Sequence, residues 1–327
     1  VCIGPAKAAL SYNNMQNIIS AAVKMKVNAI HPGFGFLSEN STFAAMCEEC
    51  NIKFIGPKPE TIEALGNKSN ARATMIAADV PVIPGSNGVV DTLEEAYAAA
   101  EQLGYPVMVK ASAGGGGKGI RIVRTRDELE NAYMSAKSEA KAAFNDDHMY
   151  MEKLVENARH IEVQILGDRF GNVIHLGERD CSLQRKNQKV LEEAPSPALS
   201  QHTRTAMCQA ALRAAKAVHY ENAGTIEFLY EQSGQFYFME MNTRVQVEHP
   251  ITEMVTGVDI IKEQLRIAAG EALSYRQEDL QMKGHAIECR INAERPDMNF
   301  APCPGKIDYL LMPGGCLGLR IDSAVYA

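Results

Sequence analysis

A pair of acidic residues on a predicted β-hairpin offers the most informative chemistry in this sequence. Segments 225–230 and 235–241 read as strands, and the Ser-Gly pair at 233–234 is typical of a two-residue hairpin turn. Such a turn places Glu227 directly opposite Glu240, with their Cβ atoms ~5 Å apart on one face. Two like charges at that spacing repel unless a cation lies between them. Because Mg²⁺ and Mn²⁺ prefer carboxylate oxygens and commonly bridge them to nucleotide phosphates, the hairpin predicts a divalent-metal site.

Every second residue after Glu240 is also polar. We therefore expect the strand to run on to Glu248, with all of these side chains on one face. They are Glu240, Asn242, Arg244, Gln246 and Glu248. A solvated sheet face would explain the alternation, but it would not favour this choice of residue types. An acid, an amide, a guanidinium, a second amide and a second acid can together hold a metal, bind an anion and supply a base.

A glycine-rich loop indicates phosphate binding. Its glycines formally match the dinucleotide pattern G-x-G-x-x-G at Gly114, Gly116 and Gly119, but segment 120–124 reads as a strand, whereas a dinucleotide loop opens a helix. No Gly-Lys-Ser/Thr follows, so the loop is not a Walker A motif either. Without Cβ atoms, backbone N–H groups can wrap around phosphates, and Lys110 and Lys118 add ammonium groups. The alternative is a flexible hairpin loop.

Two further places carry candidate anion-binding cations. Segment 179–189 has little helical or strand period and contains Arg179, Arg185, Lys186 and Lys189. This segment is either a solvated charge run or a loop that closes over an anionic substrate. Arg290 alternates with apolar neighbours on a predicted strand, and the direction of its side chain stays open.

The composition narrows the class of protein. The chain has 327 residues, of which 46% are hydrophobic and 22% charged, and its net charge is −7. That acidic balance disfavours a nucleic-acid binder, and no apolar run is long enough for a membrane span. No signal peptide is visible. Eight scattered cysteines suggest a reducing cytoplasm, and Cys47 and Cys50 lack the second pair that a zinc site needs, so we expect them to be structural.

Three blocks of predicted elements must position these residues. The first alternates strand, helix, strand, helix and strand, which implies a parallel sheet covered by helices. Its elements are strand 1–3, helix 14–25, strand 27–31, helix 43–49 and strand 53–55. The second block runs from about Glu60 to Glu271 and opens with helices. Its other strands and helices are strands 105–110, 120–124, 149–152 and 161–166, and helices 127–144, 203–218 and 258–269. A third, β-rich block starts near Gly284.

Together these motifs resemble biotin carboxylase, an ATP-grasp enzyme. The motifs that carry the resemblance are 31–40 (HPGFGFLSEN), the glycine loop, 151–153 (MEK), 179–182 (RDCS) and 240–250 (EMNTRVQVEHP). The resemblance covers essentially the whole chain. It implies an α/β (α+β) fold: a partial Rossmann-like N-terminal domain at 1–62, an ATP-grasp domain at 63–275 and the start of a C-terminal domain at 284–327. A mobile glycine-loop subdomain is expected at about 82–155.

The resemblance also implies roles for individual residues. ATP would be bound by Lys68, Lys110, Gly116, Gly117, Glu152, Lys153, Leu154, Val155, His160, Asn187, Glu227 and Glu240. Mg²⁺ or Mn²⁺ would be held by Glu227, Glu240 and Asn242. Bicarbonate would be bound by Lys189, Arg244, Gln246 and Val247, with Glu248 as the base. Biotin would be bound by Phe34, Gly35 and Arg290, with Arg290 stabilising the biotin enolate. Arg244, Glu248, Lys189 and Arg290 are thus the expected catalytic residues.

The reaction that the resemblance implies is the ATP-dependent carboxylation of biotin. Bicarbonate attacks ATP to give carboxyphosphate, which releases CO₂ and phosphate; the phosphate takes the biotin N1′ proton, and the enolate captures CO₂. The implied setting is the first half-reaction of acetyl-CoA carboxylase in fatty-acid biosynthesis. The partners would be a biotin carboxyl carrier protein, a carboxyltransferase and a second copy in a cytoplasmic homodimer, without nucleic acid or membrane.

Several alternatives and departures stay open at this point. The same domain occurs in pyruvate, propionyl-CoA and methylcrotonyl-CoA carboxylases. Another ATP-grasp carboxylate–amine ligase, the carbamoyl-phosphate synthetase large chain or a non-catalytic nucleotide-binding module would also fit parts of the pattern. Phe34 stands where the family often has Tyr, and we expect the loss of this hydroxyl near the biotin pocket to be tolerated. Asn187 stands where the family usually has His, and we expect this change to weaken nucleotide affinity. We also expect the chain to be truncated at both ends, with low stability and weak activity alone.

Overall fold

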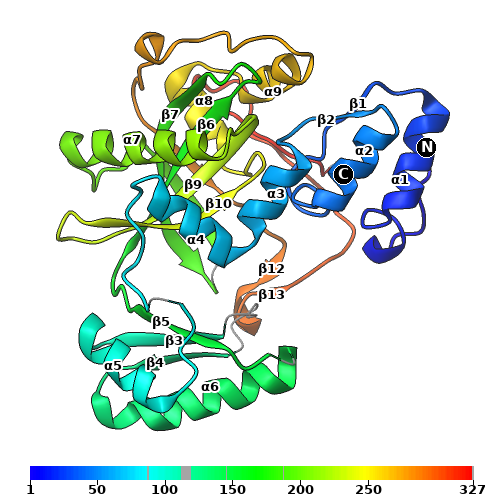
Figure 1. The fold of residues 1–327 in the computed structure, drawn as a ribbon. Helices are drawn as coiled ribbons and strands as arrows, with labels where there is room; N and C mark the ends of the chain where they lie inside the picture. Colours follow the sequence, from blue (N-terminus) through cyan, green and yellow to red (C-terminus); the bar gives the residue numbers. More distant parts are fainter. Residues whose placement is uncertain (87, 112–118, 145, 187, 326–327) are drawn as a thin grey trace. The chain divides into compact units, whose positions relative to one another are not determined.

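The computed structural model describes residues 1–86, 88–111, 119–144, 146–186 and 188–325 (Figure 1). Its two compact units are Val1–Glu288 and Cys289–Ala327, and each is described by itself. The mixture of helices and strands agrees with the predicted α/β class. Among the described residues, no helix combines the length and apolar character that crossing a membrane requires.

The N-terminal part is a small parallel α/β layer. Strands β1 (Ala29–Ile30) and β2 (Lys53–Phe54) pair in parallel, as the alternation of elements predicts. The neighbouring helices are the 3₁₀ helix η1 (Ala8–Leu10), α1 (Met15–Met25), α2 (Ser41–Glu49) and α3 (Pro59–Gly66). Asn14 and Asn40 begin α1 and α2, because each side chain accepts a hydrogen bond from a first-turn N–H group.

One strand predicted in this part is absent. Residues 1–3 form no strand, although Val1 and Ile3 have strand-forming side chains. A strand needs a neighbour whose backbone groups pair with its own, and within the described residues no strand pairs with this segment. The prediction for residues 1–3 was therefore wrong.

The Cys47–Cys50 pair fits the structural interpretation. Cys47 lies on α2 within the apolar cluster that includes Phe43 and Phe54, and it is 0% exposed. Burial, with smaller contributions from nearby Cys50 and Glu48, raises the pKa of the Cys47 thiol to about 11. Cys50 is exposed at the end of the helix. A thiol that stays protonated inside a core is a packing group rather than a nucleophile.

A three-stranded sheet follows α4 (Lys68–Ala77) and α5 (Leu93–Leu103). Its order is β4 (Ile120–Val123), β3 (Val107–Ala111) and β5 (Met149–Lys153), and all neighbours are antiparallel. Helices α5 and α6 (Leu129–Phe144) pack on this sheet, after the 3₁₀ turn η2 (Arg126–Glu128). The strand predicted after the glycine loop is therefore present, which rules out a dinucleotide-binding helix there.

The largest element is a six-stranded sheet that carries the candidate site (Figure 1). In spatial order its strands are β10 (Phe236–Asn242), β9 (Asn222–Tyr230), β6 (Arg159–Gly167), β7 (Val173–Arg185), β8 (Gln188–Ala194) and β11 (Ala286–Cys289). Apolar residues of β6 and β9, such as Ile161 and Ile226, pack with α7 (Gln201–Ala217) in one core. Polar residues alternate with them along both strands, so they face the other side of the sheet.

Helices α8 (His249–Thr256) and α9 (Ile260–Ala268) lie against β7, β8 and β9. The 3₁₀ turn η3 (Gln277–Asp279) follows them. Gly270 ends α9 with a φ of +91°, as expected for a glycine that stops a helix. The second unit contains the short antiparallel pair β12 (Glu294–Arg295) and β13 (Ala301–Pro302), with the 3₁₀ turn η4 (Pro296–Met298) between them.

The basic segment 179–189 is a β-hairpin and not an irregular loop. Most of it lies on β7 and β8, which pair antiparallel. The alternation of polar and apolar residues that marks a half-buried strand is missing, because both faces of β7 are buried along much of its length. Glu178, Arg179 and Asp180 are all buried. The prediction of little regular structure was wrong, and so was the alternative of a solvated charge run for Arg179.

Candidate active site

Glu227 on β9 and Glu240 on β10 are direct cross-strand partners, as the sequence predicts. The turn that joins the strands is longer than expected, because β9 ends at Tyr230 and β10 begins at Phe236. Residues 231–235 form this connection, closed by a hydrogen bond from the N–H of Gly234 to the carbonyl of Glu231 (3.0 Å). The two-residue turn was therefore wrong. A bulge between Phe238 and Glu240 corrects the register.

The chain leaves the sheet earlier than predicted. β10 ends at Asn242, and residues 243–248 form bends and turns before α8 begins at His249. A continuous strand to Glu248 with five side chains on one face was wrong. Pro250 favours a helix over a longer strand, because proline suits the first turn of a helix and has no N–H group to donate a hydrogen bond within a central sheet. The loop nevertheless returns Gln246 to Glu227, to which its Nε2 donates a hydrogen bond, and it brings Glu248 to Lys189.

Lys189 is the centre of the buried polar cluster. Its Nζ donates hydrogen bonds to Glu162 (2.5 Å), Glu248 (2.8 Å) and Glu227 (2.9 Å). The lysine side chain is 15% exposed, and the three carboxylate side chains are less exposed still. Burial alone would lower the pKa of Lys189, but the three carboxylates together raise it well above its usual range. Lys189 is therefore a fixed positive charge that joins β6, β8, β9 and the start of α8.

The amides of Asn242 and Gln246 complete the surroundings of Glu227. Its Oε1 accepts hydrogen bonds from Asn242 Nδ2 (2.9 Å) and Gln246 Nε2 (3.0 Å), besides the bond from Lys189. The amide oxygen of Asn242 accepts a bond from Arg244 Nη2 (3.2 Å). Of the predicted site residues, Lys189, Glu227, Asn242, Arg244, Gln246 and Glu248 are thus joined in one network.

Arg179 supports this network from inside the sheet. Its side chain is 0% exposed, and its Nε donates to Glu162 (2.6 Å). Nη2 donates to Gln246 (2.9 Å) and Thr225 (3.2 Å). Nη1 donates to Gln164 (2.8 Å) and Thr252 (2.9 Å). One guanidinium therefore connects β6, β9, the 243–248 loop and α8, and it holds both Glu162 and Gln246 in place.

The side chains of this cluster carry more negative than positive charge, which favours binding of a cation. Glu162, Glu227 and Glu248 contribute three negative charges, whereas Lys189 and Arg179 contribute two positive ones; the charge of Arg244 is balanced by its ion pair with Glu39. Cys181 adds no charge, because burial raises its pKa well above the usual range. One oxygen each of Glu162 and Glu248 lies within 4.8 Å of the Cys181 sulfur, but a protonated thiol is a poor ligand for Mg²⁺, which prefers oxygen.

Glu227, Glu240 and Asn242 fit a magnesium ion better. Their side chains provide hard oxygen donors, and Glu240 is an exposed partner directly across from buried Glu227. The uncompensated negative charge at this end of the sheet favours an incoming cation. These three residues therefore form the part of the site whose donor chemistry suits a divalent metal.

Residues predicted to bind the nucleotide lie on β3, β5 and β6. The ammonium of Lys110 forms an ion pair with Glu152 and lies 5.8 Å from the ring centroid of Tyr150. Lys153 holds the end of β5 through its backbone N–H, which donates to Pro84 O (2.8 Å), and through its Nζ, which donates to Gly104 O (2.7 Å).

The segment after β5 and the start of β6 complete this region. The backbone N–H of Leu154 donates to Pro106 O (3.1 Å), and half-buried Val155 follows. The backbone N–H of His160 donates to Ser182 Oγ (3.0 Å), and burial lowers the pKa of its imidazole, so the ring is neutral at pH 7.

The remaining predicted residues lie elsewhere in the chain or outside its described part. Gly116, Gly117, Asn187 and the side chain of Lys68 lie outside the described part of the chain. Arg290 belongs to the second unit. Phe34, 48% exposed, and Gly35 lie on the loop before α2, and Gly35 has a φ of +82°. Val247 is half-buried beside Glu248.

Sequence reasoning missed Glu162 entirely and gave Arg179 no role of its own. A signal for Glu162 was present, because His160, Glu162 and Gln164 alternate with apolar residues along 159–167. That pattern marks a sheet face lined with polar groups. The contacts of Arg179 join residues far apart in sequence, so no local pattern could reveal them.

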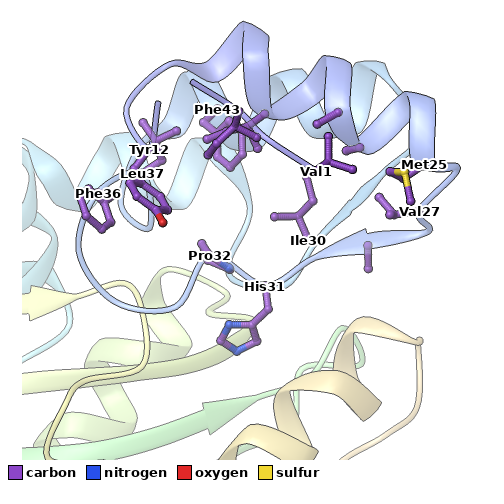
Figure 2. Close-up of a pocket in the computed structure, with 15 residues that line it drawn as sticks. Val1, Tyr12, Met25, Val27, Ile30, His31, Pro32, Phe36, Leu37 and Phe43 are labelled. Atoms are coloured by element: carbon purple, nitrogen blue, oxygen red, sulfur yellow. The ribbon is translucent and has the colours of Figure 1, made fainter. Parts of the chain in front are cut away.

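An apolar pocket of about 400 Å³ lies elsewhere, between α1 and the loop before α2 (Figure 2). Ile30, Phe36 and Leu37 are among the side chains that line it, together with Tyr12 and His31. His31 Nε2 lies 3.1 Å from Gln264 Oε1, and its Nδ1 accepts a hydrogen bond from the N–H of Gly33 (3.0 Å). This lining provides no group of charges comparable to the cluster around Lys189, so we do not place the chemistry here.

Comparisons with known proteins identify the family of this chain. Residues 1–62 match the model of the biotin carboxylase N-terminal domain, and residues 67–276 match that of the carbamoyl-phosphate synthase L chain ATP binding domain. The chain is 59% identical to a biotin carboxylase of Nostoc over 100% of its length, which is 73% of that protein. It is 53% identical to a pyruvate carboxylase subunit of Methanothermobacter thermautotrophicus, covering 99% of this chain and 66% of that protein.

Solved structures give the same result. A Campylobacter jejuni biotin carboxylase in complex with a β,γ-ATP compound is 52% identical, with a TM-score of 0.87 over 96% of this chain and 70% of that chain. The biotin carboxylase domain dimer of Hydrogenobacter thermophilus 2-oxoglutarate carboxylase, with MgADP and bicarbonate, is 53% identical. Its TM-score is 0.83 over 93% of this chain and 67% of that chain. The chain belongs to the biotin carboxylase family of ATP-grasp enzymes.

Proposed function

We propose that this protein uses ATP and bicarbonate to carboxylate the biotin of a carrier protein, as the first half-reaction of acetyl-CoA carboxylase. The observation that carries the proposal is the cluster around Lys189, in which a buried cation, the carboxylate Glu248 and the amide of Gln246 lie together. This set has the groups needed to bind a small anion and to remove its proton. A related domain that binds MgADP and bicarbonate supports it.

In this proposal bicarbonate lies among Lys189, Arg244, Gln246 and the backbone near Val247. Lys189 and Arg244 balance its negative charge, and Glu248 accepts its proton as a bicarbonate oxygen attacks the γ-phosphorus of ATP. The bond between that phosphorus and the bridging oxygen of ADP breaks, which gives ADP and carboxyphosphate. Burial of the cluster keeps water away from the intermediate.

The divalent metal belongs with Glu227, Glu240 and Asn242 in the same proposal. When bound, it would neutralise charge that develops on the phosphoryl oxygens. Asn242 has a second task, because it joins Glu227 to Arg244 through its two amide atoms. Asn242 thereby fixes the spacing between Glu227, in the proposed metal and phosphate site, and Arg244, in the proposed bicarbonate site.

We assign the nucleotide to the region of the three-stranded sheet and β6. Lys110 would bind phosphate oxygens, residues 152–155 would hold the adenine, and His160 would contact ATP as a neutral imidazole. Lys68, Gly116, Gly117 and Asn187 keep the nucleotide roles that the resemblance implies. The proposed domains are likewise 1–62, 63–275 with a mobile subdomain at about 82–155, and 284–327.

Biotin would lie near Phe34 and Gly35, with Arg290 stabilising its enolate. After carboxyphosphate releases CO₂, the remaining phosphate takes the N1′ proton of biotin, and the enolate nitrogen bonds to CO₂. The proposed partners are a biotin carboxyl carrier protein and a carboxyltransferase in the cytoplasm. A homodimer is supported by the dimeric 2-oxoglutarate carboxylase domain.

The experiment is ATP hydrolysis by the protein expressed from its complete gene, with and without bicarbonate and free biotin. We expect hydrolysis to require bicarbonate and to increase when biotin is added. We expect Glu248→Gln to abolish turnover and to keep ATP binding, measured by calorimetry. Glu49→Gln, at an exposed position on α2, is the control.

Two other outcomes would favour a different function. Bicarbonate-dependent hydrolysis that does not increase when biotin is added would favour a carbamoyl-phosphate synthetase-like ligase. Unchanged turnover in Glu248→Gln would favour a non-catalytic nucleotide-binding module.

A second setting is the biotin carboxylase part of pyruvate carboxylase. The 53% identity to the Methanothermobacter pyruvate carboxylase protein favours it, since that value is close to the 59% found for the Nostoc biotin carboxylase. The chemistry on biotin is the same in both settings, and the acceptor is chosen by the carboxyltransferase. Mixing the carboxylated carrier with each carboxyltransferase, and measuring malonyl-CoA or oxaloacetate, separates them.

A further inference from the structure

Glu39 contacts the proposed bicarbonate site from a distant part of the sequence. It lies in the loop just before α2, more than two hundred residues from the loop that follows β10. Its Oε2 accepts a hydrogen bond from Arg244 Nε (2.8 Å). Its Oε1 accepts one from the backbone N–H of Thr243 (3.0 Å). One carboxylate therefore holds both the side chain of Arg244 and the backbone just before it.

The other nitrogens of Arg244 are also engaged. Nη1 donates to the carbonyl of Val245 (3.2 Å), and Nη2 donates to Asn242 Oδ1 (3.2 Å). Val245 and Asn242 are close to Arg244 in the sequence, whereas Glu39, which accepts the bond from Nε, comes from a distant part of the chain. A guanidinium held at all three nitrogens has one orientation, whereas a guanidinium without Glu39 would regain rotamer freedom.

Glu39 is itself held in place. The backbone N–H of the next residue, Asn40, donates to Leu37 O (3.1 Å), and the Asn40 side chain accepts a bond from Phe43 N (2.7 Å) at the start of α2. On the other side, the N–H of Ser38 donates to Gly35 O (3.0 Å). The carboxylate thus extends from a loop fixed at both ends, and its side chain is only 40% exposed.

We propose that Glu39 is a positioning residue that orients Arg244 for bicarbonate. This inference rests on the proposed function, because it takes Arg244 as a ligand of bicarbonate. An arginine that is already oriented binds its anion without the entropy loss of ordering a long side chain. Glu39 also lies on the same loop as Phe34 and Gly35, so one short segment serves both the proposed biotin site and the bicarbonate site.

A purely structural role is the competing explanation. Glu39 joins the N-terminal layer to the loop after β10, so its loss would lower stability if attachment were its task. The two explanations differ in what they change. Orientation of Arg244 alters the KM for bicarbonate at constant melting temperature, whereas attachment alters the melting temperature and leaves the KM of the folded enzyme unchanged.

The test compares Glu39→Gln and Glu39→Asp with Glu49→Gln in the protein expressed from its complete gene. Glu39→Gln keeps the shape but removes the charge that binds Arg244. We expect its bicarbonate KM to rise ~3- to 10-fold, as for loss of one charge-assisted hydrogen bond, with a smaller change in kcat and in the KM for ATP. Glu39→Asp keeps the charge and is expected to recover part of the loss. Glu49→Gln should match the parent.

A double-mutant cycle with Arg244→Lys separates failure of this inference from failure of the proposed function. If Arg244→Lys leaves the bicarbonate KM unchanged, the proposed role of Arg244 is wrong. If Arg244→Lys raises the KM and Glu39→Gln does not, the positioning role of Glu39 is wrong. We expect the double variant to be no worse than Arg244→Lys alone, because Glu39 acts through Arg244. Additive effects on the KM would overturn the inference.

Discussion

Glu227 and Glu240 face each other because β10 contains one extra residue. Near the turn the pairs are Tyr230 with Phe236 and Phe228 with Phe238, and this register continued would set Met239 opposite Glu227. The bulge between Phe238 and Glu240 leaves Met239 unpaired and brings Glu240 opposite Glu227. β-bulges often re-aim a side chain beside a functional site. The two carboxylates of the proposed metal site thus owe their alignment to a local irregularity.

Glu240→Gln tests the metal assignment without disturbing the fold. Glu240 is exposed, so the amide is expected to leave the free energy of unfolding nearly unchanged. If Glu240 is a metal ligand, the Mg²⁺ concentration for half-maximal ATP hydrolysis should rise ~10-fold or more, which corresponds to ~1.4 kcal/mol. A magnesium titration and a urea unfolding curve measure both quantities. An unchanged magnesium requirement would remove Glu240 from the metal site.

Arg179→Lys tests whether the buried guanidinium organises the cluster. Lysine keeps the charge but cannot reach all the partners that Arg179 holds. We expect the free energy of unfolding to fall by ~2–4 kcal/mol, because buried polar groups lose their hydrogen bonds. We also expect a higher KM for bicarbonate, since Gln246 loses its bond to Nη2. Thr252→Val removes a single partner and is expected to cost only ~1 kcal/mol. Full stability of Arg179→Lys would contradict this account.

The cysteines should divide sharply in their reactivity. Burial raises the pKa of Cys208 to about 12 and also raises the pKa values of Cys47 and Cys181, so these buried thiols carry little thiolate at pH 8. We expect iodoacetamide to label the exposed cysteines in the folded protein and to reach the buried ones only after unfolding. The exposed set is Cys2, Cys50, Cys289, Cys303 and Cys316. Peptide mass spectrometry reads out each site, and rapid labelling of Cys47 in the folded protein would contradict its structural role.

Acid should destabilise the protein partly through His175. Burial lowers the pKa of this imidazole in the folded state, and its Nδ1 accepts a bond from the N–H of Gly177 (3.3 Å). As the pH falls through the usual histidine range, the unfolded chain takes up a proton before the folded protein does, so the free energy of unfolding decreases. Below pH 6.5 the His175 imidazole lowers the free energy of unfolding by at most ~1.4 kcal/mol for each further unit of pH decrease. His175→Gln should make urea unfolding less pH-dependent between pH 7 and 5, whereas His202→Gln, at an exposed position, should not. Equal slopes for all three proteins would contradict the assignment.

Local patterns predicted most of the helices and strands, because each has its own periodicity and its own end signals. Helix α9 illustrates this, since its apolar stripe and Gly270 mark it without reference to the rest of the fold. The strand predicted at residues 1–3 failed for the opposite reason. A strand also depends on a pairing partner, and that partner is a property of the whole fold.

The members of the polar cluster around Lys189 were more predictable from the sequence than its geometry. The pairing of Glu227 with Glu240 was predicted correctly, but from a turn that does not exist, because the bulge compensates for the longer connection. Glu248 was expected on a strand and instead precedes α8, yet it still reaches Lys189. The contacts of Arg179 and Glu39 join distant segments, and no spacing along the chain encodes such contacts.

Transfer of labelled carbon from bicarbonate to biotin tests the central claim most directly. The protein expressed from its complete gene is incubated with ATP, Mg²⁺, free biotin and ¹⁴C-bicarbonate, and carboxybiotin is trapped as its methyl ester. The account predicts that label appears in biotin only when ATP is present, and that Glu248→Gln abolishes it while Glu49→Gln does not. ATP hydrolysis without any label in biotin, by a folded protein, would contradict it.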